Sequence, residues 1–191
     1  MRPKPHFAPP FRTPQAHGDP TATTLAVPGY RQVRGYTCGY ACALMVLRYF
    51  GADVGGEKLF LRLGTGRDGT RQNALVRELR AGGVSVNVRY DVDFARLRTA
   101  VDRGKLIIAY HYQAEHWVVL YGYGVEPARV YVADSRAGEP SLHLWDSYGP
   151  TLRGFGIICS DRRATVPGAA IEPPSAAPDT EQLRFGFVAF R

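Results

Sequence analysis

A glycine-bearing loop runs into an apolar segment in the sequence Gln32-Val-Arg-Gly-Tyr-Thr-Cys38-Gly-Tyr-Ala-Cys42-Ala-Leu-Met-Val-Leu-Arg-Tyr-Phe50. Apolar residues recur at roughly helical spacing, and Gly51 stands where a helix would stop. The pattern predicts an amphipathic helix over residues 38–50, with Cys38 at or near its N-terminus. Unpaired N–H groups and the helix dipole favour an anion there, so a cysteine in this position commonly has a lowered pKa. We therefore interpret Cys38 as a nucleophile.

The cysteines also allow a purely structural interpretation. Free cysteines are often small buried residues, and Cys38 at a helix start fits that alternative as well. Cys42 lies four residues further along the same predicted helix, and Cys159 lies in an apolar strand-like segment. We expect Cys42 and Cys159 to be packed core residues.

Outside this stretch, the period of the apolar residues changes from helical to strand-like along the chain. Further helices are predicted over residues 57–63, 70–81, 94–102 (capped by Asp93) and 141–148. Strands are predicted over residues 84–88, 106–110, 117–123, 130–133 and 154–159. The strands at 117–123 and 130–133 look like an antiparallel pair joined around Glu126-Pro127. Helices followed by an antiparallel sheet indicate an α+β fold, with the N-terminal helices packed on the sheet.

The two ends of the chain differ from this middle part in composition. Residues 1–26 are rich in proline, which predicts an extended or disordered arm. Residues 27–191 are long enough for one substantial domain. Within it, residues 160–182 form a Pro/Ala-rich excursion, and residues 183–190 are expected to add a terminal strand.

Charge and cysteine count exclude several classes of function. The 24 Lys and Arg residues against 17 Asp and Glu residues give a net charge of +7, but no basic run is concentrated enough to predict nucleic-acid binding. Three cysteines at these positions fit neither a disulfide framework nor a zinc site, and no metal or cofactor is implied. No apolar run approaches the roughly 20 residues that span a membrane. We expect no membrane partner and a cytoplasmic location, with signal-independent export left open.

A nucleophilic cysteine needs a base, a group that orients the base, and donors for the oxyanion. His116 opens the 117–123 strand, and Asp134 ends the 130–133 strand, so antiparallel pairing would bring the two together. His111 is the alternative base. Gln32 precedes Cys38 by six residues, and its amide could bracket an oxygen together with the Cys38 N–H. The structural alternatives are a turn residue for Asp134 and a surface loop residue for Gln32.

The motifs Gln-x5-Cys-Gly, His-Trp-Val-Val-Leu-Tyr-Gly-Tyr and Val-x-Val-x-Asp resemble the papain-like cysteine peptidase superfamily, and within it the bacteriocin-processing (double-glycine leader) peptidases. The resemblance covers roughly residues 25–160 and implies a papain-like fold. It assigns the nucleophile to Cys38, the base to His116, the orienting carboxylate to Asp134 and the oxyanion donor to Gln32. Two positions depart from the family pattern: Thr37 stands where Asp is common, and Ser135 where Pro is common.

The resemblance implies a cysteine peptidase that hydrolyses a peptide or isopeptide bond in a peptide or protein substrate. An acyltransferase or transglutaminase-like enzyme could use the same thioester, because an amine can resolve it as well as water. A non-catalytic binding module on the same scaffold is a further alternative.

Overall fold

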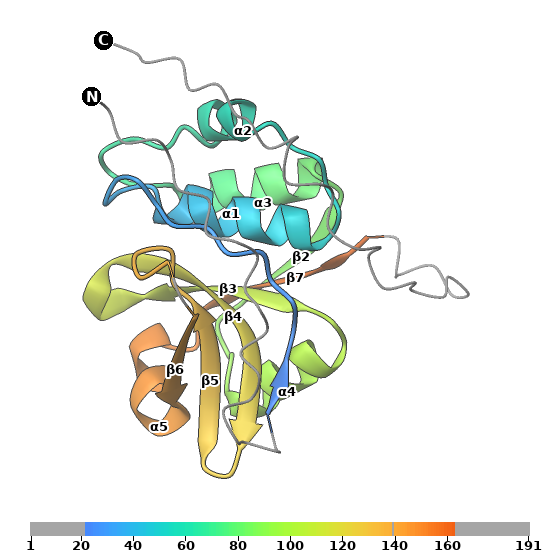
Figure 1. The fold of residues 1–191 in the computed structure, drawn as a ribbon, viewed down its shortest axis with the longest axis vertical. Coiled ribbons are helices and arrows are strands. Elements are labelled where there is room, and N and C mark those ends of the chain that lie inside the picture. The colour runs from blue at the N-terminus through green and yellow to red at the C-terminus, as the bar shows by residue number, and fades with distance from the viewer. Residues whose placement is uncertain (1–21, 139, 163–191) are drawn as a thin grey trace.

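The computed structural model describes residues 22–138 and 140–162, whose elements are labelled in Figure 1. The helices are α1 (Cys38–Tyr49), α2 (Gly56–Leu63), α3 (Gln72–Ala81), α4 (Phe94–Asp102) and α5 (Trp145–Tyr148), with short 3-10 helices at Tyr112–Ala114 and Gly149–Leu152. The strands are β1 (Thr23–Thr24), β2 (Val84–Arg89), β3 (Leu106–His111), β4 (His116–Val125), β5 (Ala128–Ala133), β6 (Pro140–Leu144) and β7 (Gly156–Asp161).

The described strands form one antiparallel sheet in the order β2-β7-β3-β4-β5-β6, and β1 pairs with the far end of β4. The sheet twists strongly, so that β2, β7 and β3 run across the view of Figure 1 while β4, β5 and β6 run down it. The predicted pairing around Glu126-Pro127 is confirmed, since β4 and β5 pair from Val125↔Ala128 onward. The first residues of β4 and the last residues of β5 therefore lie at the same end of the sheet, beneath α1.

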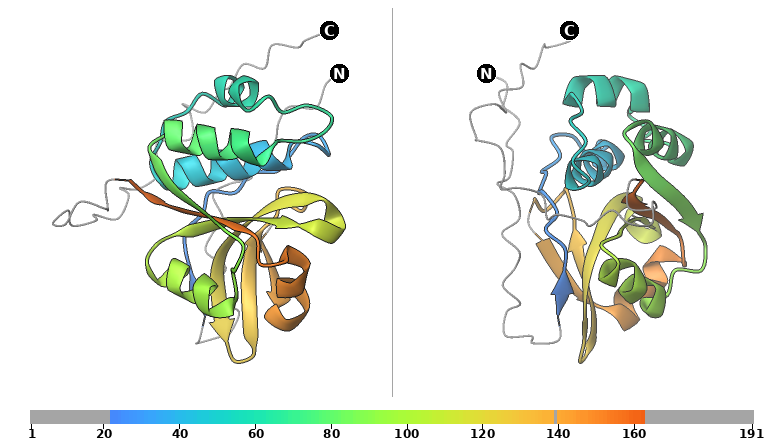
Figure 2. Two further views of the ribbon diagram at one scale, coloured as in Figure 1. Left: turned by 180° about the vertical axis from the view of Figure 1, so that it is seen from behind. Right: turned by 90° about the vertical axis from the view of Figure 1, so that its right-hand side faces the viewer.

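Helices cover both faces of the sheet. α1, α2 and α3 lie on one face, and α4 and α5 lie on the other (Figures 1 and 2). Two apolar clusters result, one under α1 and one under α4. All of β4 except its last residue is buried, because it lies between the two clusters. The predicted α+β class, with N-terminal helices on an antiparallel sheet, is confirmed. None of the helices in residues 22–138 and 140–162 is long and apolar enough to span a membrane.

Helix α1 is more deeply buried than its sequence pattern indicated. The prediction was an amphipathic helix, yet every residue from Cys38 to Leu47 is buried. The reason is that α1 contacts β4 on one side and α2 and α3 on the others. The exposed face that an amphipathic helix needs is therefore covered by two further helices.

The structure corrects the helix predicted over residues 141–148. Residues 140–144 form β6, which pairs with β5, and only Trp145–Tyr148 is helical. The alternating pattern of Ser-Leu-His-Leu fits an edge strand beside β5 better than a helix. Residues 23–24 of the predicted N-terminal arm pair with β4. Residues 1–21 of the arm, the excursion beyond residue 162 and the strand predicted at 183–190 lie outside the described residues.

Candidate active site

Cys38 is the first residue of α1, and the residue is only 4% exposed. Burial raises the pKa of the thiol, but a hydrogen bond with His116 and the backbone N–H groups of Trp117 and Gly39 lower it, and the net result lies below the ordinary value. The Gly39 N–H belongs to the first turn of α1, where backbone donors have no partner within the helix. The thiolate is therefore stabilised by the helix start and by a neighbouring imidazole together.

His116 and Asp134 form a hydrogen-bonded pair beside the thiol. His116 begins β4 with a side chain 2% exposed, and its Nε2 lies 2.7 Å from Oδ1 of Asp134, which directly follows β5. A carboxylate only accepts hydrogen bonds, so Nε2 carries the proton. Nδ1 is buried and has no hydrogen-bond partner among the nitrogen and oxygen atoms of the described residues. It is the ring nitrogen left to exchange a proton with Cys38.

The charges of the pair reinforce one another. Burial lowers the pKa of His116, but the hydrogen bond that His116 donates to Asp134 and the contact with Cys38 outweigh it and raise the pKa above its ordinary value. Burial raises the pKa of Asp134, but His116 and the backbone N–H of Arg136, 2.7 Å away, hold it below its usual range. All three shifts act in the same direction, toward the thiolate, the imidazolium and the carboxylate.

Gln32 lies in the loop before α1, and both the nitrogen and the oxygen of its side-chain amide form hydrogen bonds. Its Nε2 donates to the carbonyl oxygens of Arg34 (3.0 Å) and Gly35 (3.2 Å). Its Oε1 accepts a 2.6 Å hydrogen bond from the hydroxyl of Ser135, and its backbone N–H donates to the Ser135 carbonyl. The structure therefore joins the Gln32 loop to the residue that follows Asp134, while the amide hydrogens point to loop carbonyls in this state.

Ser135 is a contact that the sequence pattern did not reveal. In the sequence, Ser135 was noted only as a departure from the proline that is common in the family that the chain resembles. In the structure, the residue is fully buried. Its position directly after Asp134 was the available signal. Proline has no hydroxyl and could not make this hydrogen bond to Gln32.

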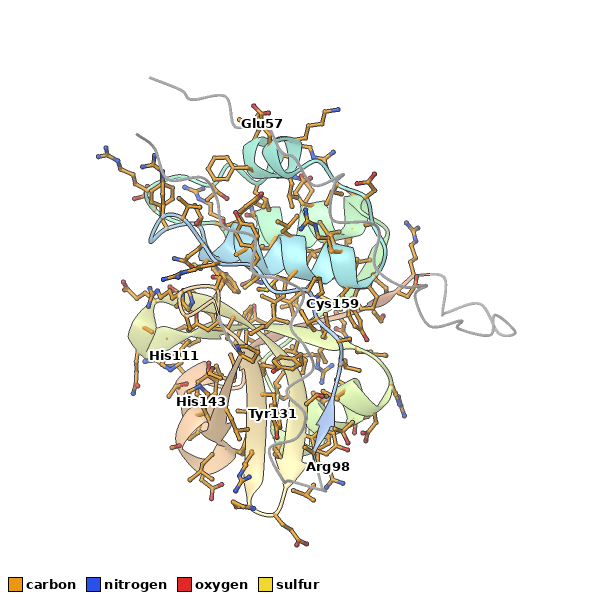
Figure 3. All side chains as sticks on the ribbon, in the orientation of Figure 1. Glu57, Arg98, His111, Tyr131, His143 and Cys159 are labelled. Atoms are coloured by element: carbon orange, nitrogen blue, oxygen red, sulfur yellow. The ribbon has the colours of Figure 1, made fainter. Side chains whose placement is uncertain are left out.

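The remaining candidates lie away from the thiol–imidazole contact. His111 pairs with His116 in the β3–β4 register, but its Nδ1 accepts from Ala114 N–H and its ring packs against Tyr148. Figure 3 shows His111 near His143, whose ring stacks on the same tyrosine. Burial raises the pKa of Cys42 well above its ordinary value, which keeps it a neutral core thiol. Within the described residues, no group of three or more His, Cys, Asp and Glu residues is placed to hold a metal ion.

Gly39, next to Cys38, has no room for a side chain. An added Cβ would lie 2.6 Å from Cβ of Thr70 and 3.1 Å from Cδ1 of Trp117. We expect Gly39→Ala to lower the free energy of unfolding by about 1–3 kcal/mol, because neither neighbour is a flexible chain end. Gly35→Ala is the matched control, since no atom lies within 4 Å of its Cβ. Urea unfolding measures both, and equal effects would contradict the packing described here.

A cysteine at a helix start, a histidine on the adjacent strand and a carboxylate behind it, on an α+β scaffold, are the architecture of the papain-like cysteine peptidase class. The model of the Peptidase C39 family matches residues 27–144, more than half of the chain. The chain belongs to the Peptidase C39 family.

The chain also shares its fold with solved structures. A double-glycine motif protease from an AMS/PCAT transporter, solved in complex with the leader peptide, has a TM-score of 0.59 at 23% identity and covers 72% of this chain and 93% of its own. The peptidase domain of Streptococcus ComA, a bi-functional ABC transporter, has a TM-score of 0.55 at 17% identity, covering 69% and 96%. A C39-like peptidase from Bacillus anthracis has a TM-score of 0.57 at 16% identity, covering 74% and 98%. A search of curated proteins found no match.

Proposed function

We propose that the protein is a cysteine peptidase that cleaves a peptide bond with Cys38, His116 and Asp134. The observation that carries the proposal is the contact of buried Cys38 and His116 with half-buried Asp134, in which the thiol pKa is lowered and the imidazole pKa is raised. The family supports the reaction class, and the related protease solved with a leader peptide supports a peptide as the substrate.

The reaction follows from the protonation states. The Cys38 thiolate attacks the carbonyl carbon of the scissile bond, and the C–N bond breaks as the imidazolium of His116 gives its proton to the leaving amine. Water then attacks the thioester while His116 takes a proton from it, and the C–S bond breaks to release acid and restore the thiolate. Asp134 keeps the imidazole in the orientation and tautomer that both steps need.

The oxyanion formed in each step is bound by the Cys38 backbone N–H and Gln32. In the free enzyme both amide hydrogens of Gln32 are directed at the carbonyls of Arg34 and Gly35. One of them exchanges its carbonyl for the substrate oxygen during the reaction. The exchange is favourable because a hydrogen bond to an oxyanion is stronger than one to a neutral carbonyl.

The decisive experiment is the reactivity of the thiol. Iodoacetamide at mildly acidic pH should alkylate Cys38 faster than it alkylates a free cysteine, because only a lowered pKa leaves thiolate under these conditions. Peptide mapping by mass spectrometry identifies the modified residue. If Cys38 reacts no faster than free cysteine, the proposed mechanism is wrong.

Ser135 provides a second test through Gln32. Ser135→Ala removes the donor to Oε1, and we expect kcat to fall by about fivefold with KM unchanged, as for the loss of one net hydrogen bond. Ser135→Thr keeps the hydroxyl and should restore most of kcat. In a Gln32→Ala background, Ser135→Ala should have no further effect on kcat. A full additive effect in that background would show that Ser135 does not act through Gln32.

A further inference from the structure

A cavity of about 280 Å³ lies close to Gly39, the neighbour of Cys38, although Cys38 itself does not line it. Two of its lining residues, Thr70 and Trp117, are those that pack against Gly39, the residue after Cys38. Burial raises the pKa of a third, Tyr110, and the Glu115 carboxylate and Cys38 thiolate add to this rise, so Tyr110 lies within electrostatic reach of both. A substrate held at Cys38 would therefore have a side chain next to this cavity.

Aromatic rings form one wall of the cavity. Tyr110 packs edge-on against Trp117 (4.9 Å between centroids) and Tyr112 (5.1 Å), and Trp117 packs against Phe155 (5.9 Å). The wall is held in place because the Trp117 indole donates a 3.1 Å hydrogen bond to the carbonyl of Thr70. Aromatic faces attract both aliphatic chains and cations.

The charged residues of the described part of the chain that line the cavity are all acidic. Asp68 and Glu115 contribute exposed carboxylates, and neither is paired with a cation in the part of the chain that the structure describes. No Lys or Arg of that part lines the cavity. Two arginines lie nearby: Arg153 stacks 4.8 Å from the ring of Tyr112, and Arg136 donates to the Ala114 carbonyl. The Arg153 contact shows that this aromatic cluster already binds a guanidinium.

We propose that this cavity binds a long basic side chain, lysine or arginine, of the peptide substrate next to the scissile bond. The aliphatic stem lies against the rings, and the cation meets the carboxylates of Asp68 and Glu115. The volume lies just below the roughly 300–1,000 Å³ of small-molecule sites, which suits a single side chain. The inference rests on the proposed peptidase function and adds its substrate preference.

The test uses epoxysuccinyl dipeptides, which alkylate a cysteine thiolate and can extend to either side of it. One set carries lysine at each position in turn, and a matched set carries norleucine, which has the same stem without the charge. The readout is the ratio of the two rate constants for Cys38 alkylation, so a general change in thiol reactivity cancels. For one position we expect lysine to react about tenfold faster, as for a cation–π contact combined with ion pairs at an exposed site.

Two variants locate the effect. In Asp68→Asn/Glu115→Gln the lysine-to-norleucine ratio should fall to about threefold, because the ion pairs are gone and only the cation–π contact with the rings remains. Glu57→Gln is the matched control, since Glu57 lies at the far end of the helical layer (Figure 3), and its ratio should stay at the wild-type value. A ratio near one at every position in the wild type would overturn the inference, and so would an unchanged ratio in the double variant. Slow alkylation by iodoacetamide would instead overturn the proposed function, which separates the two failures.

Discussion

Cys38→Ala is expected to reduce peptide hydrolysis by a factor on the order of 10⁴–10⁶, which is the scale on which removal of a covalent nucleophile acts. Alanine fills most of the volume of the buried cysteine but cannot form the thioester. The same variant should lose the fast phase of iodoacetamide alkylation. Turnover of a synthetic peptide that the wild type cleaves, followed by mass spectrometry, measures the first effect.

Cys42→Ala is the matched control for that variant. Cys42 lies four residues further along α1 and is fully buried, and burial raises its pKa. We expect turnover close to that of the wild type, with a loss of stability of about 1 kcal/mol from the small cavity. If Cys38→Ala kept the fast phase of iodoacetamide alkylation and Cys42→Ala lost it, Cys42 and not Cys38 would be the reactive thiol.

Asp134→Asn is expected to lower kcat/KM by a factor on the order of 10²–10⁴, because the carboxylate that fixes the His116 tautomer is lost. The pH profile should change in a definite direction. In the wild type, we expect activity to rise with pH as Cys38 ionises, below its ordinary pKa, and to fall as His116 loses its proton, above its ordinary pKa. Removing the charge of Asp134 lowers the pKa of His116, so the alkaline limb moves to lower pH and the active range narrows.

The control for this profile is Asp93→Asn at the start of α4. Asp93 also accepts a hydrogen bond from a backbone N–H, that of Arg96 at 2.8 Å, and it carries the same charge. Asparagine caps helices about as well as aspartate, so stability and pH profile should both stay close to the wild type. An alkaline limb that does not move in Asp134→Asn would show that Asp134 does not set the protonation of His116.

Most helices and strands were predictable because their signals lie within short windows of sequence. The helix from Phe94 to Asp102 has the predicted bounds, and Asp93 caps it through the Arg96 N–H as expected. The last described strand begins at Gly156, two residues later than predicted, because Arg153 and Gly154 both adopt positive φ and a turn precedes the strand. β6 was missed because its alternating pattern spans only a few residues, and a signal that short indicates a strand only once β5 is known to lie beside it.

The sequence by itself determined the α+β class and the order Gln32, Cys38, His116, Asp134, since periodicity, turn residues and motif spacing are local properties. Only the tertiary structure decided how these side chains meet. It buries α1 on all sides, pairs Nε2 of His116 with Asp134, and directs the amide of Gln32 to loop carbonyls. It also joins Gln32 to Ser135, 103 residues further along the chain. Such contacts depend on how β4 and β5 pair and how α1 packs across them, and no short window of sequence contains that information.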